Sequence, residues 1–218
     1  MSKRIIIISG GELNEEFVLS ILEKEENQYV IGVDRGMEFL CRHQILPNYI
    51  VGDFDSVKKE IGDYYRNETD VPIREYNPVK DASDTEIAIR LAMTLGGREL
   101  LILGATGTRL DHVLANLGLL SMGKEQGVRI AIADQWNYIT LAESGTILHR
   151  EEQFGKYVSF FTVGGDVTGL TLRGFKYPLN GYHLTVEDSG LTVSNEISEE
   201  TAEILYESGQ LLMIMSRD

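Results

Sequence analysis

Cysteine is almost absent from this chain, and proline and histidine are scarce, with four of each. The single cysteine, Cys41, excludes an intramolecular disulfide framework and fits a reducing cytosol, so we expect a cytoplasmic protein. Long hydrophobic runs are also lacking. The apolar segment 5–8 stops at Ser9, so it is too short for a secretory signal or a membrane span and suits a buried first strand.

Basic residues are few as well. Lys and Arg total 20 against 34 Asp and Glu, which gives a formal net charge of −14. A surface of this charge repels nucleic acids and anionic membranes, so we expect neither as a partner. A phosphate-bearing substrate would need local cations, supplied by a metal ion or by a few placed basic side chains.

Several common catalytic patterns are missing. The glycine-rich segment 104–112 has neither a Walker motif nor the glycine pattern that binds dinucleotides. The histidines lack metal-ligand spacing, and no Ser/His/Asp or Cys/His nucleophile arrangement stands out. The candidates for chemistry are therefore mainly carboxylates.

The first half of the chain alternates short apolar runs with segments of helical periodicity. Such alternation predicts parallel strands covered by helices, and we expect an α/β domain with a mostly parallel sheet over residues 1–127. Ser83 and Glu86 have the spacing of a capping box at a helix start. The expected strands are 5–8, 29–33, 49–51, 71–76 and 100–103, and the expected helices lie near 17–22, 37–43, 58–70, 83–95 and 110–120.

The character of the sequence changes after about residue 128. Short strand-like runs are separated by Gly, Asn, Asp and Ser, and Asn180-Gly181 predicts a turn. We therefore expect residues 128–218 to form an all-β domain, an antiparallel sandwich. The expected strands are 128–133, 138–141, 146–149, 157–163, 170–172, 183–186, 191–193, 203–206 and 211–215.

The segment 51–56 ends an apolar run with two aspartates, Asp53 and Asp55. If the segment is extended, side chains two residues apart share a face, so both carboxylates would point the same way. A hard divalent cation such as Mg²⁺ compensates that repulsion, commonly together with substrate phosphates. A simple turn is the alternative, because Gly, Asp and Ser also form turns.

Other aspartates also fall where apolar strands end or helices begin. Ligands of open α/β sheets bind outside the carboxyl ends of the strands, so these side chains are expected to converge on one crevice. Helix capping is the alternative for Asp81 and Asp84, which are three residues apart at a helix start. The positions concerned are Asp34, Asp53, Asp55, Asp81, Asp84 and Asp111.

The glycine-rich segment 104–112 leads into a helix, and a helix N-terminus is a ready site for an anion. Arg109 could neutralise a phosphate there, and Thr106 and Thr108 could donate hydrogen bonds. His112 could reach the same phosphate, although a lone histidine is more often structural. Taken alone, this segment is a weak signal.

Two segments of the second half carry polar and aromatic groups in otherwise regular β sequence. They are residues 174–179, which include Tyr177 beside Pro178, and residues 193–196. An exposed tyrosine beside a proline could stack on a flat ring. A tyrosine that covers the edge of the sandwich is the alternative.

Six motifs together carry a resemblance to a known family. They are Asp34-Arg-Gly, Gly52-Asp-Phe-Asp-Ser56, Lys80-Asp-x-x-Asp84-Thr-Glu, Gly104-x-x-Gly-x-Arg-x-Asp-His112, Gly174-Phe-Lys-Tyr-Pro-Leu179 and Ser194-Asn-Glu196. With these motifs in this order, the chain resembles thiamine pyrophosphokinases over nearly its whole length. The resemblance implies a nucleotide-binding α/β domain and a thiamine-binding β-sandwich, assembled as a homodimer with active sites shared between subunits.

The resemblance also implies a reaction. The family transfers a pyrophosphoryl group from ATP to the hydroxyethyl oxygen of thiamine, releases AMP and uses Mg²⁺. Carried over to this sequence, the catalytic and metal-binding carboxylates are Asp53, Asp55 and Asp84, with Asp34 and Asp81 in the same acidic cluster. The nucleotide side comprises Thr106, Thr108, Arg109, Asp111 and His112, and the thiamine side comprises Tyr177, Ser194 and Asn195. Tyr177 falls where some members carry a tryptophan against the thiamine rings.

Two other functions remain open at this point. The chain could be a pyrophosphokinase for another hydroxyalkyl heterocycle, as the tyrosine at position 177 allows. It could also be a non-catalytic module that binds Ca²⁺ or a nucleotide, although such a module needs neither the Gly-Thr-Arg-x-Asp loop nor the Ser-Asn-Glu motif. The group that accepts the thiamine hydroxyl proton is also open between Asp55 and Asp84.

Overall fold

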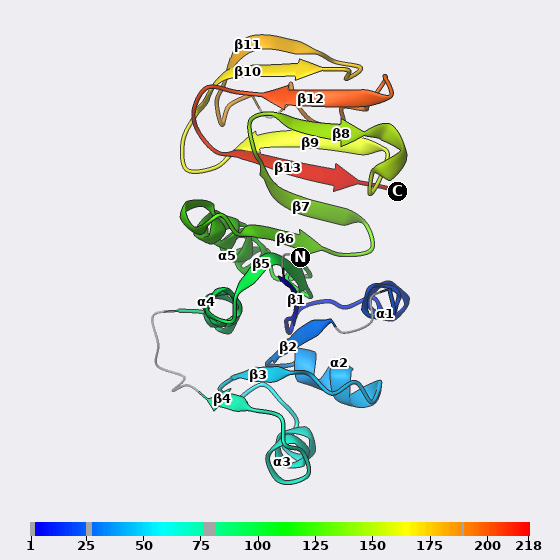
Figure 1. Cartoon of the computed structure of the whole chain (residues 1–218), viewed down its shortest axis with the longest axis vertical. Helices are drawn as coiled ribbons and strands as arrows, with labels where there is room; N and C mark the ends of the chain where they lie inside the picture. The colour runs from blue at the N-terminus through cyan, green and yellow to red at the C-terminus, as the bar shows by residue number, and fades with distance from the viewer. Residues whose placement is uncertain (1–2, 25–27, 76–81, 189) are drawn as a thin grey trace. The chain divides into compact units, whose positions relative to one another are not determined.

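The structure, a computed structural model, describes residues 3–24, 28–75, 82–188 and 190–218. The chain divides into two compact units, Met1–Gln135 and Trp136–Asp218. We call them unit 1 and unit 2 and describe each by itself (Figure 1).

Unit 1 contains a parallel sheet, as expected. Its strands pair in the order β4-β3-β2-β1-β5-β6, and every neighbouring pair is parallel. The strands are β1 (Lys3–Ile8), β2 (Tyr29–Val33), β3 (Tyr49–Gly52), β4 (Ile73–Glu75), β5 (Gly97–Leu103) and β6 (Arg129–Ala133).

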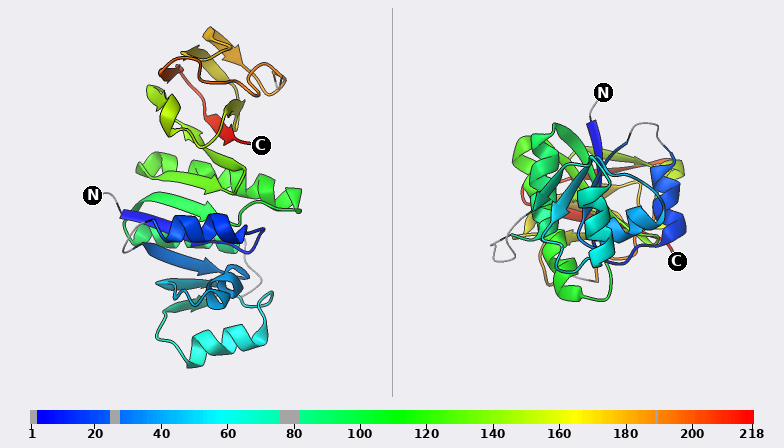
Figure 2. Two further views of the ribbon diagram at one scale, coloured as in Figure 1. Left: turned by 90° about the vertical axis from the view of Figure 1, so that its right-hand side faces the viewer. Right: turned by 90° about the horizontal axis from the view of Figure 1, so that it is seen from below.

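Helices cover both faces of this sheet. They are α1 (Glu15–Leu22), α2 (Gly36–Arg42), α3 (Lys59–Asn67), α4 (Asp84–Thr94) and α5 (Leu110–Leu119), followed by the 3₁₀ helix η1 (Leu120–Gln126). Figures 1 and 2 show α1 and α2 on one side of the sheet and α4 and α5 on the other. Burial on both faces explains why β1 is a run of four isoleucines, Ile5 to Ile8, each 0% exposed. Among the described helices, none has the length and apolar character needed to cross a membrane.

The strand order indicates on which edge of this sheet a ligand would bind. It is the edge formed by the carboxyl ends of the strands, which we call the switch-point edge. The chain runs outward from β1 to β4 and then returns to β5 and β6 on the other side of β1. The order therefore reverses between β1 and β5, and such switch points are where open α/β sheets bind ligands. Because all six strands are parallel, the loops that follow them leave from the same edge.

One strand differs from the sequence-based expectation. Residues 128–133 were expected to open the all-β domain, but β6 pairs in parallel with β5 inside unit 1. Gly127, in the left-handed region at φ 62°, ends η1 and turns the chain back toward the sheet. A short apolar run looks the same in a parallel and an antiparallel sheet, so its pattern alone does not assign it.

Unit 2 is a β-sandwich with antiparallel pairing throughout, as expected. One group of strands is ordered β7-β13-β9 and the other β11-β10-β12-β8. Both groups contribute to one apolar core, which includes Phe160 of β9, Leu172 of β10 and Ile204 of β12. The strands are β7 (Asn137–Ala142), β8 (Thr146–His149), β9 (Tyr157–Thr162), β10 (Val167–Arg173), β11 (Leu179–Leu184), β12 (Thr201–Leu205) and β13 (Leu211–Ser216), with a 3₁₀ turn η2 (Arg150–Glu152).

Two details of unit 2 correct the expectations. Asn180-Gly181 does not form a hairpin turn but lies within β11, where the register against β10 shifts. Gly181 has φ 60°, and its N–H donates to the Thr171 hydroxyl at 2.9 Å, so the pair forms an irregularity inside the strand. Residues 191–193 form no strand, and the chain there is a series of turns.

Candidate active site

Three carboxylates meet at the switch-point edge of unit 1. Asp34 follows β2, Asp53 follows β3, and Asp84 is the first residue of α4. One oxygen of each carboxylate lies within 4.8 Å of the others, and all three residues are partly buried. We call these residues the acidic cluster. The predicted convergence of acidic strand ends and helix starts is confirmed for them.

Close backbone packing holds Asp34 beside β3. Asp34 has φ 45°, a left-handed conformation that is uncommon for a non-glycine residue. A side chain at Gly52 would collide with the Asp34 carboxylate, and one at Gly36 would collide with the carbonyl of Ile8. Gly52 thus lets the residue after β2 approach the end of β3, and Gly36 lets the start of α2 approach the end of β1.

Phe54 anchors the loop that carries Asp53. It also has positive φ, at 63°, and its ring is buried against Met37, Ile50 and Tyr65. The guanidinium of Arg66 lies over the same ring, 4.2 Å from its centroid. The left-handed turn at Phe54 thus places an apolar side chain inside while its two acidic neighbours stay at the edge.

A hydrogen-bond chain connects this apolar packing to Asp34. The Tyr65 hydroxyl donates to the Met37 carbonyl at 3.3 Å, and the Met37 N–H donates to the Asp34 carbonyl at 3.0 Å. Burial raises the pKa of the Tyr65 phenol, so it remains a donor over the physiological range. Asp34 and Asp53 are therefore positioned by the same packed group of elements, namely α2, α3 and the loop after β3.

Asp84 is oriented by the start of α4. Ser83 is the N-cap, and its hydroxyl accepts a hydrogen bond from the Glu86 N–H at 3.2 Å. The predicted cap is thus confirmed, while the Glu86 carboxylate forms an ion pair with Arg90 one turn further on. Thr85 adds a tie to β1, because its hydroxyl lies 2.9 Å from that of the buried Ser9.

Asp55 lies apart from the acidic cluster. The expectation that Asp53 and Asp55 project from one extended segment is wrong, because β3 ends at Gly52 and the chain turns at Phe54. Asp55 is exposed, and its N–H donates to the Asp53 carboxylate at 3.1 Å. From the sequence, a turn over residues 51–56 was the alternative to a carboxylate site. The structure contains both the turn and a carboxylate cluster. Asp81, also predicted for this cluster, lies outside the described residues.

The donor set of the acidic cluster fits a hard divalent cation. Mg²⁺ prefers carboxylate oxygens at about 2.1 Å, which places its ligands about 3–4 Å apart. The three carboxylate oxygens lie within 4.8 Å of one another, which is close to that spacing. Asp34, Asp53 and Asp84 are thus the residues that would hold the metal.

The glycine-rich loop after β5 packs against the loop after β1. The N–H of Gly11 donates to the Gly104 carbonyl at 2.8 Å, and the N–H of Glu12 donates to the Thr106 carbonyl at 2.9 Å. A side chain at Gly11 would collide with both carbonyls. The loop is therefore held at the switch point, close to the start of α5.

The predicted phosphate-binding side chains differ in their surroundings. The Thr106 hydroxyl donates to the Asp134 carboxylate at 2.9 Å, whereas Thr108 and His112 are exposed. Asp134 follows β6 and was missed by the sequence reasoning, although it obeys the same rule of an acid at a strand end. It went unnoticed because residues 128–133 were expected in the other domain.

Arg109 and Asp111 form an exposed ion pair at the start of α5. The guanidinium donates to both carboxylate oxygens, through Nε at 3.0 Å and through Nη2. This bidentate contact lowers the pKa of Asp111 and raises that of Arg109. The remaining N–H groups of Arg109 can still bind an anion.

The predicted thiamine-side residues come together in unit 2. Tyr177 is 54% exposed, and Asn195 is 2% exposed beneath it. The Asn195 amide contacts the backbone of Tyr177 on both sides, as donor and as acceptor. Ser194 is exposed in a left-handed conformation, φ 56°, and its N–H donates to the Ser159 hydroxyl at 3.0 Å.

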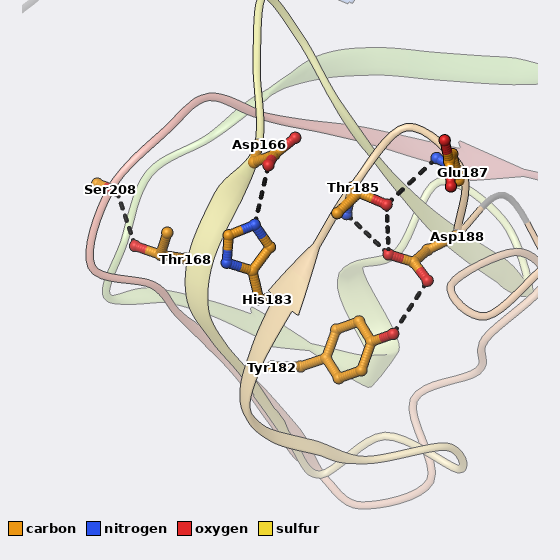
Figure 3. A network of polar contacts seen from close by, with 8 residues as sticks. All are labelled: Asp166, Thr168, Tyr182, His183, Thr185, Glu187, Asp188 and Ser208. Carbon is orange, nitrogen blue, oxygen red and sulfur yellow. Dashed lines mark hydrogen bonds and ion pairs between the residues drawn. The ribbon is translucent and has the colours of Figure 1, made fainter.

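A separate polar network closes the turn after β11 (Figure 3). The Asp188 carboxylate accepts hydrogen bonds from the N–H and hydroxyl of Thr185 and from the Tyr182 hydroxyl. These bonds lower the pKa of Asp188. Nearby, His183 contacts Asp166 at 2.9 Å on the surface. The donors and acceptors of this network satisfy one another, so it stabilises the turn and the β10–β11 edge.

Two family models match the chain. The model for the thiamin pyrophosphokinase catalytic domain matches residues 22–132, and the model for the thiamin pyrophosphokinase vitamin B1 binding domain matches residues 145–211. The first match lies within unit 1 and the second within unit 2.

Individual relatives agree with these matches. A thiamine pyrophosphokinase of Bacillus subtilis (strain 168) is 34% identical over 99% of this chain and 100% of its own length. A crystal structure of thiamine pyrophosphokinase from Bacillus subtilis has a TM-score of 0.86 at 31% identity, covering 99% of this chain and 100% of that one. The yeast thiamin pyrophosphokinase structure has a TM-score of 0.83 at 15% identity, covering 99% and 86%, and so shares the fold.

The geometry predicts that Asp53 and Asp55 differ in metal binding. Asp53→Asn removes a charge from the acidic cluster, so we expect Mn²⁺ affinity to fall at least about 10-fold, since even outer-shell partners of a metal are worth about 10–100-fold. Asp55→Asn leaves the cluster intact and should change the affinity only slightly. Titration of free Mn²⁺ by electron paramagnetic resonance measures both. Equal losses in the two variants would contradict this assignment.

Proposed function

This chain belongs to the thiamine pyrophosphokinase family, and we propose that it transfers a pyrophosphoryl group from ATP to thiamine in a Mg²⁺-dependent reaction, giving thiamine diphosphate and AMP. The observation that carries the proposal is the acidic cluster at the switch-point edge, where Asp34, Asp53 and Asp84 lie within 4.8 Å of one another. Family membership supports formation of thiamine diphosphate, and the geometry supports a metal-assisted route to it.

The charge of the chain favours a metal ion beside such a substrate. At −14, the protein repels the phosphates of ATP unless cations lie between them. Mg²⁺ bound by the acidic cluster would neutralise charge on the phosphate oxygens and align the phosphates for displacement. The role of the three aspartates is to bind and orient it there.

The transfer itself needs one bond made and one broken. The thiamine hydroxyl oxygen attacks the β-phosphorus of ATP, the bond from that phosphorus to the α,β-bridging oxygen breaks, and AMP leaves with that oxygen. The hydroxyl proton passes to a protein carboxylate. Positioning and electrostatic stabilisation account for most catalysis in reactions of this kind.

We assign the proton acceptor to Asp55. Asp84 belongs to the acidic cluster, and a carboxylate bound to a cation is a weak base. Asp55 is exposed at the rim of the same loop and outside the cluster. Its N–H donates to the Asp53 carboxylate, so the loop positions the proton acceptor beside a residue that holds the metal.

The glycine-rich loop and the start of α5 serve the nucleotide in this proposal. Thr106, Thr108 and His112 border the phosphates, and Arg109 offers them the guanidinium N–H groups that do not face Asp111. Asp111 fixes the plane of the Arg109 guanidinium through their bidentate contact. The N-terminus of α5 adds backbone donors and its dipole.

Tyr177 and Ser194 serve thiamine in unit 2. The Tyr177 ring, 54% exposed, offers a flat face for a cationic aromatic heterocycle. Ser194 presents an exposed hydroxyl beside it in the strained conformation that functional loops often adopt. A related acceptor with a different hydroxyalkyl heterocycle is the second candidate, because a tyrosine face does not discriminate sharply among flat rings.

We further propose a homodimer with shared active sites. Two leucines on α5, Leu110 and Leu114, are 73% and 69% exposed, and α5 has no buried residue in this chain alone. Apolar side chains close to Ser194 in the sequence are exposed as well, namely Leu191 at 44% and Val193 at 40%. Exposed apolar patches of this kind favour contact with a second copy. The proposal includes a cytoplasmic location, which rests on the single cysteine.

The first test is product analysis. With ATP, thiamine and Mg²⁺, the chain should release AMP and thiamine diphosphate in equal amounts, and removal of metal by EDTA should abolish both. Anion-exchange chromatography separates AMP from ADP. Formation of ADP, or AMP formed only with a heterocycle other than thiamine, would contradict the proposed reaction, and the latter result would favour the second candidate.

Asp55→Asn tests the proton acceptor. Removal of a general base costs about 10²–10⁴-fold in rate, so turnover should fall by this amount while Mn²⁺ affinity remains near that of the wild type. Steady-state kinetics at saturating ATP and thiamine measure the loss. The assignment is wrong if Asp55→Asn retains wild-type turnover.

Mixed dimers test whether the sites are shared. Asp84→Asn impairs unit 1 and Tyr177→Ala impairs unit 2, so a heterodimer of the two variants has one site with both changes and one with neither. Co-expression should therefore restore about a quarter of wild-type activity at subsaturating thiamine. Asp84→Asn co-expressed with Asp53→Asn is the matched control, because every site then keeps a change and no activity returns. Absence of recovery in the first mixture would rule out shared sites.

A further inference from the structure

The side chain of Asn195 is a buried amide with three specific partners. Its Oδ1 accepts hydrogen bonds from the N–H groups of Tyr177 and Glu196, both at 3.0 Å. Its Nδ2 donates to the Tyr177 carbonyl at 2.8 Å. The residue is 2% exposed, so almost none of its surface is open to a ligand.

We propose that Asn195 is a positioning residue for the acceptor substrate and acts entirely through Tyr177. It fixes the backbone from which the Tyr177 ring projects and does not itself touch the substrate. This inference rests on the proposed function, because it takes Tyr177 as the face on which the acceptor stacks. It revises the expectation from the sequence that Asn195 contacts thiamine directly.

The backbone of Asn195 gives the side chain a rigid base. Its N–H donates to the Val158 carbonyl at 3.0 Å, and its carbonyl accepts from the Val158 N–H at 2.8 Å. Val158 lies in β9 and is 0% exposed. Asn195 is thus paired to the core sheet on one side and to Tyr177 on the other.

Tyr177 has little backbone freedom left once Asn195 is in place. Both of its backbone polar groups bond to the one amide, much as they would to a neighbouring strand. Pro178 follows, and the residue before a proline is confined to extended conformations. Only the side-chain torsions of the tyrosine remain free, so the ring is presented in a narrow set of positions.

The rest of the loop is anchored independently. Phe175 is buried and packs edge-to-face on Phe160, with ring centroids 5.6 Å apart. Lys176 pairs with Glu196 at 2.8 Å, which raises the pKa of the lysine and lowers that of the glutamate. These contacts hold the loop in addition to Asn195, so we expect the loss of its amide to be felt mainly at Tyr177.

A preorganised ring binds a flat ligand better than a mobile one, because less freedom is lost on binding. The amide of Asn195 would thus raise affinity for the acceptor without contacting it. Such an effect belongs to substrate binding, so it should appear in the KM for thiamine and leave kcat and the KM for ATP nearly unchanged.

A double-mutant cycle tests this inference. Asn195→Ala should raise the KM for thiamine about 10-fold, the equivalent of one or two lost hydrogen bonds. In a chain that already carries Tyr177→Ala, the same change should have almost no further effect, because residues that act through each other are not additive. Thiamine affinity measured by isothermal titration calorimetry should follow the same pattern.

Two further variants separate positioning from general stability. Thr192→Val removes the buried hydroxyl that donates to the Phe160 carbonyl from the same segment, without touching Tyr177, and should lower the melting temperature with the KM for thiamine unchanged. If Asn195→Ala does not fold, Asn195→Asp keeps the two acceptor contacts but replaces the donor to the Tyr177 carbonyl with a carboxylate oxygen that repels it. Asn195→Asp should raise the KM for thiamine when Tyr177 is present and should have little effect in a chain that carries Tyr177→Ala.

The outcomes are distinct. Additive effects of the Asn195 and Tyr177 changes, or a loss confined to kcat, would overturn the positioning role while leaving the proposed function intact. A wild-type chain that neither binds nor converts thiamine would overturn the proposed function and this inference with it.

Discussion

Electrostatic repulsion among Asp34, Asp53 and Asp84 is the constraint around which unit 1 is built. Three carboxylates within 4.8 Å oppose folding in a chain that already carries a charge of −14. The surrounding structure holds them together through a left-handed turn at Asp34, an apolar anchor at Phe54 and a capped helix at Asp84. Such a concentration of carboxylate oxygens suits a divalent cation.

Most of the fold could be predicted because the signals were local. Continuous isoleucine in residues 5–8 predicts a strand covered on both faces, and Ser83 before an apolar i+4 repeat predicts the start of α4. The exceptions depend on pairing partners far away in sequence. The pattern of residues 128–133 indicates a strand but not the domain to which it belongs. Asn180-Gly181 indicates a turn, and only the hydrogen bond from the Gly181 N–H to the Thr171 hydroxyl shows that the pair lies within a strand.

The candidate site shows the same division. Acidic residues at strand ends were visible in the sequence, so Asp34, Asp53 and Asp84 could be expected to meet. The separate position of Asp55 could not be predicted from the sequence, because it depends on the positive φ of Phe54. That conformation follows from the burial of the Phe54 ring in the tertiary structure. Likewise, the resemblance places Asn195 on the thiamine side, but only the structure shows that its buried amide bonds to the backbone of Tyr177.

The small apolar cluster of Met37, Ile50, Phe54 and Tyr65 has a consequence for how such a protein evolves. None of these side chains belongs to the acidic cluster, yet their packing sets the positions of two of its aspartates. A substitution at one of these residues must be compensated by substitutions at its neighbours before the aspartates regain their positions. Selection on catalysis therefore extends into this part of the interior, and its residues should vary together rather than one at a time.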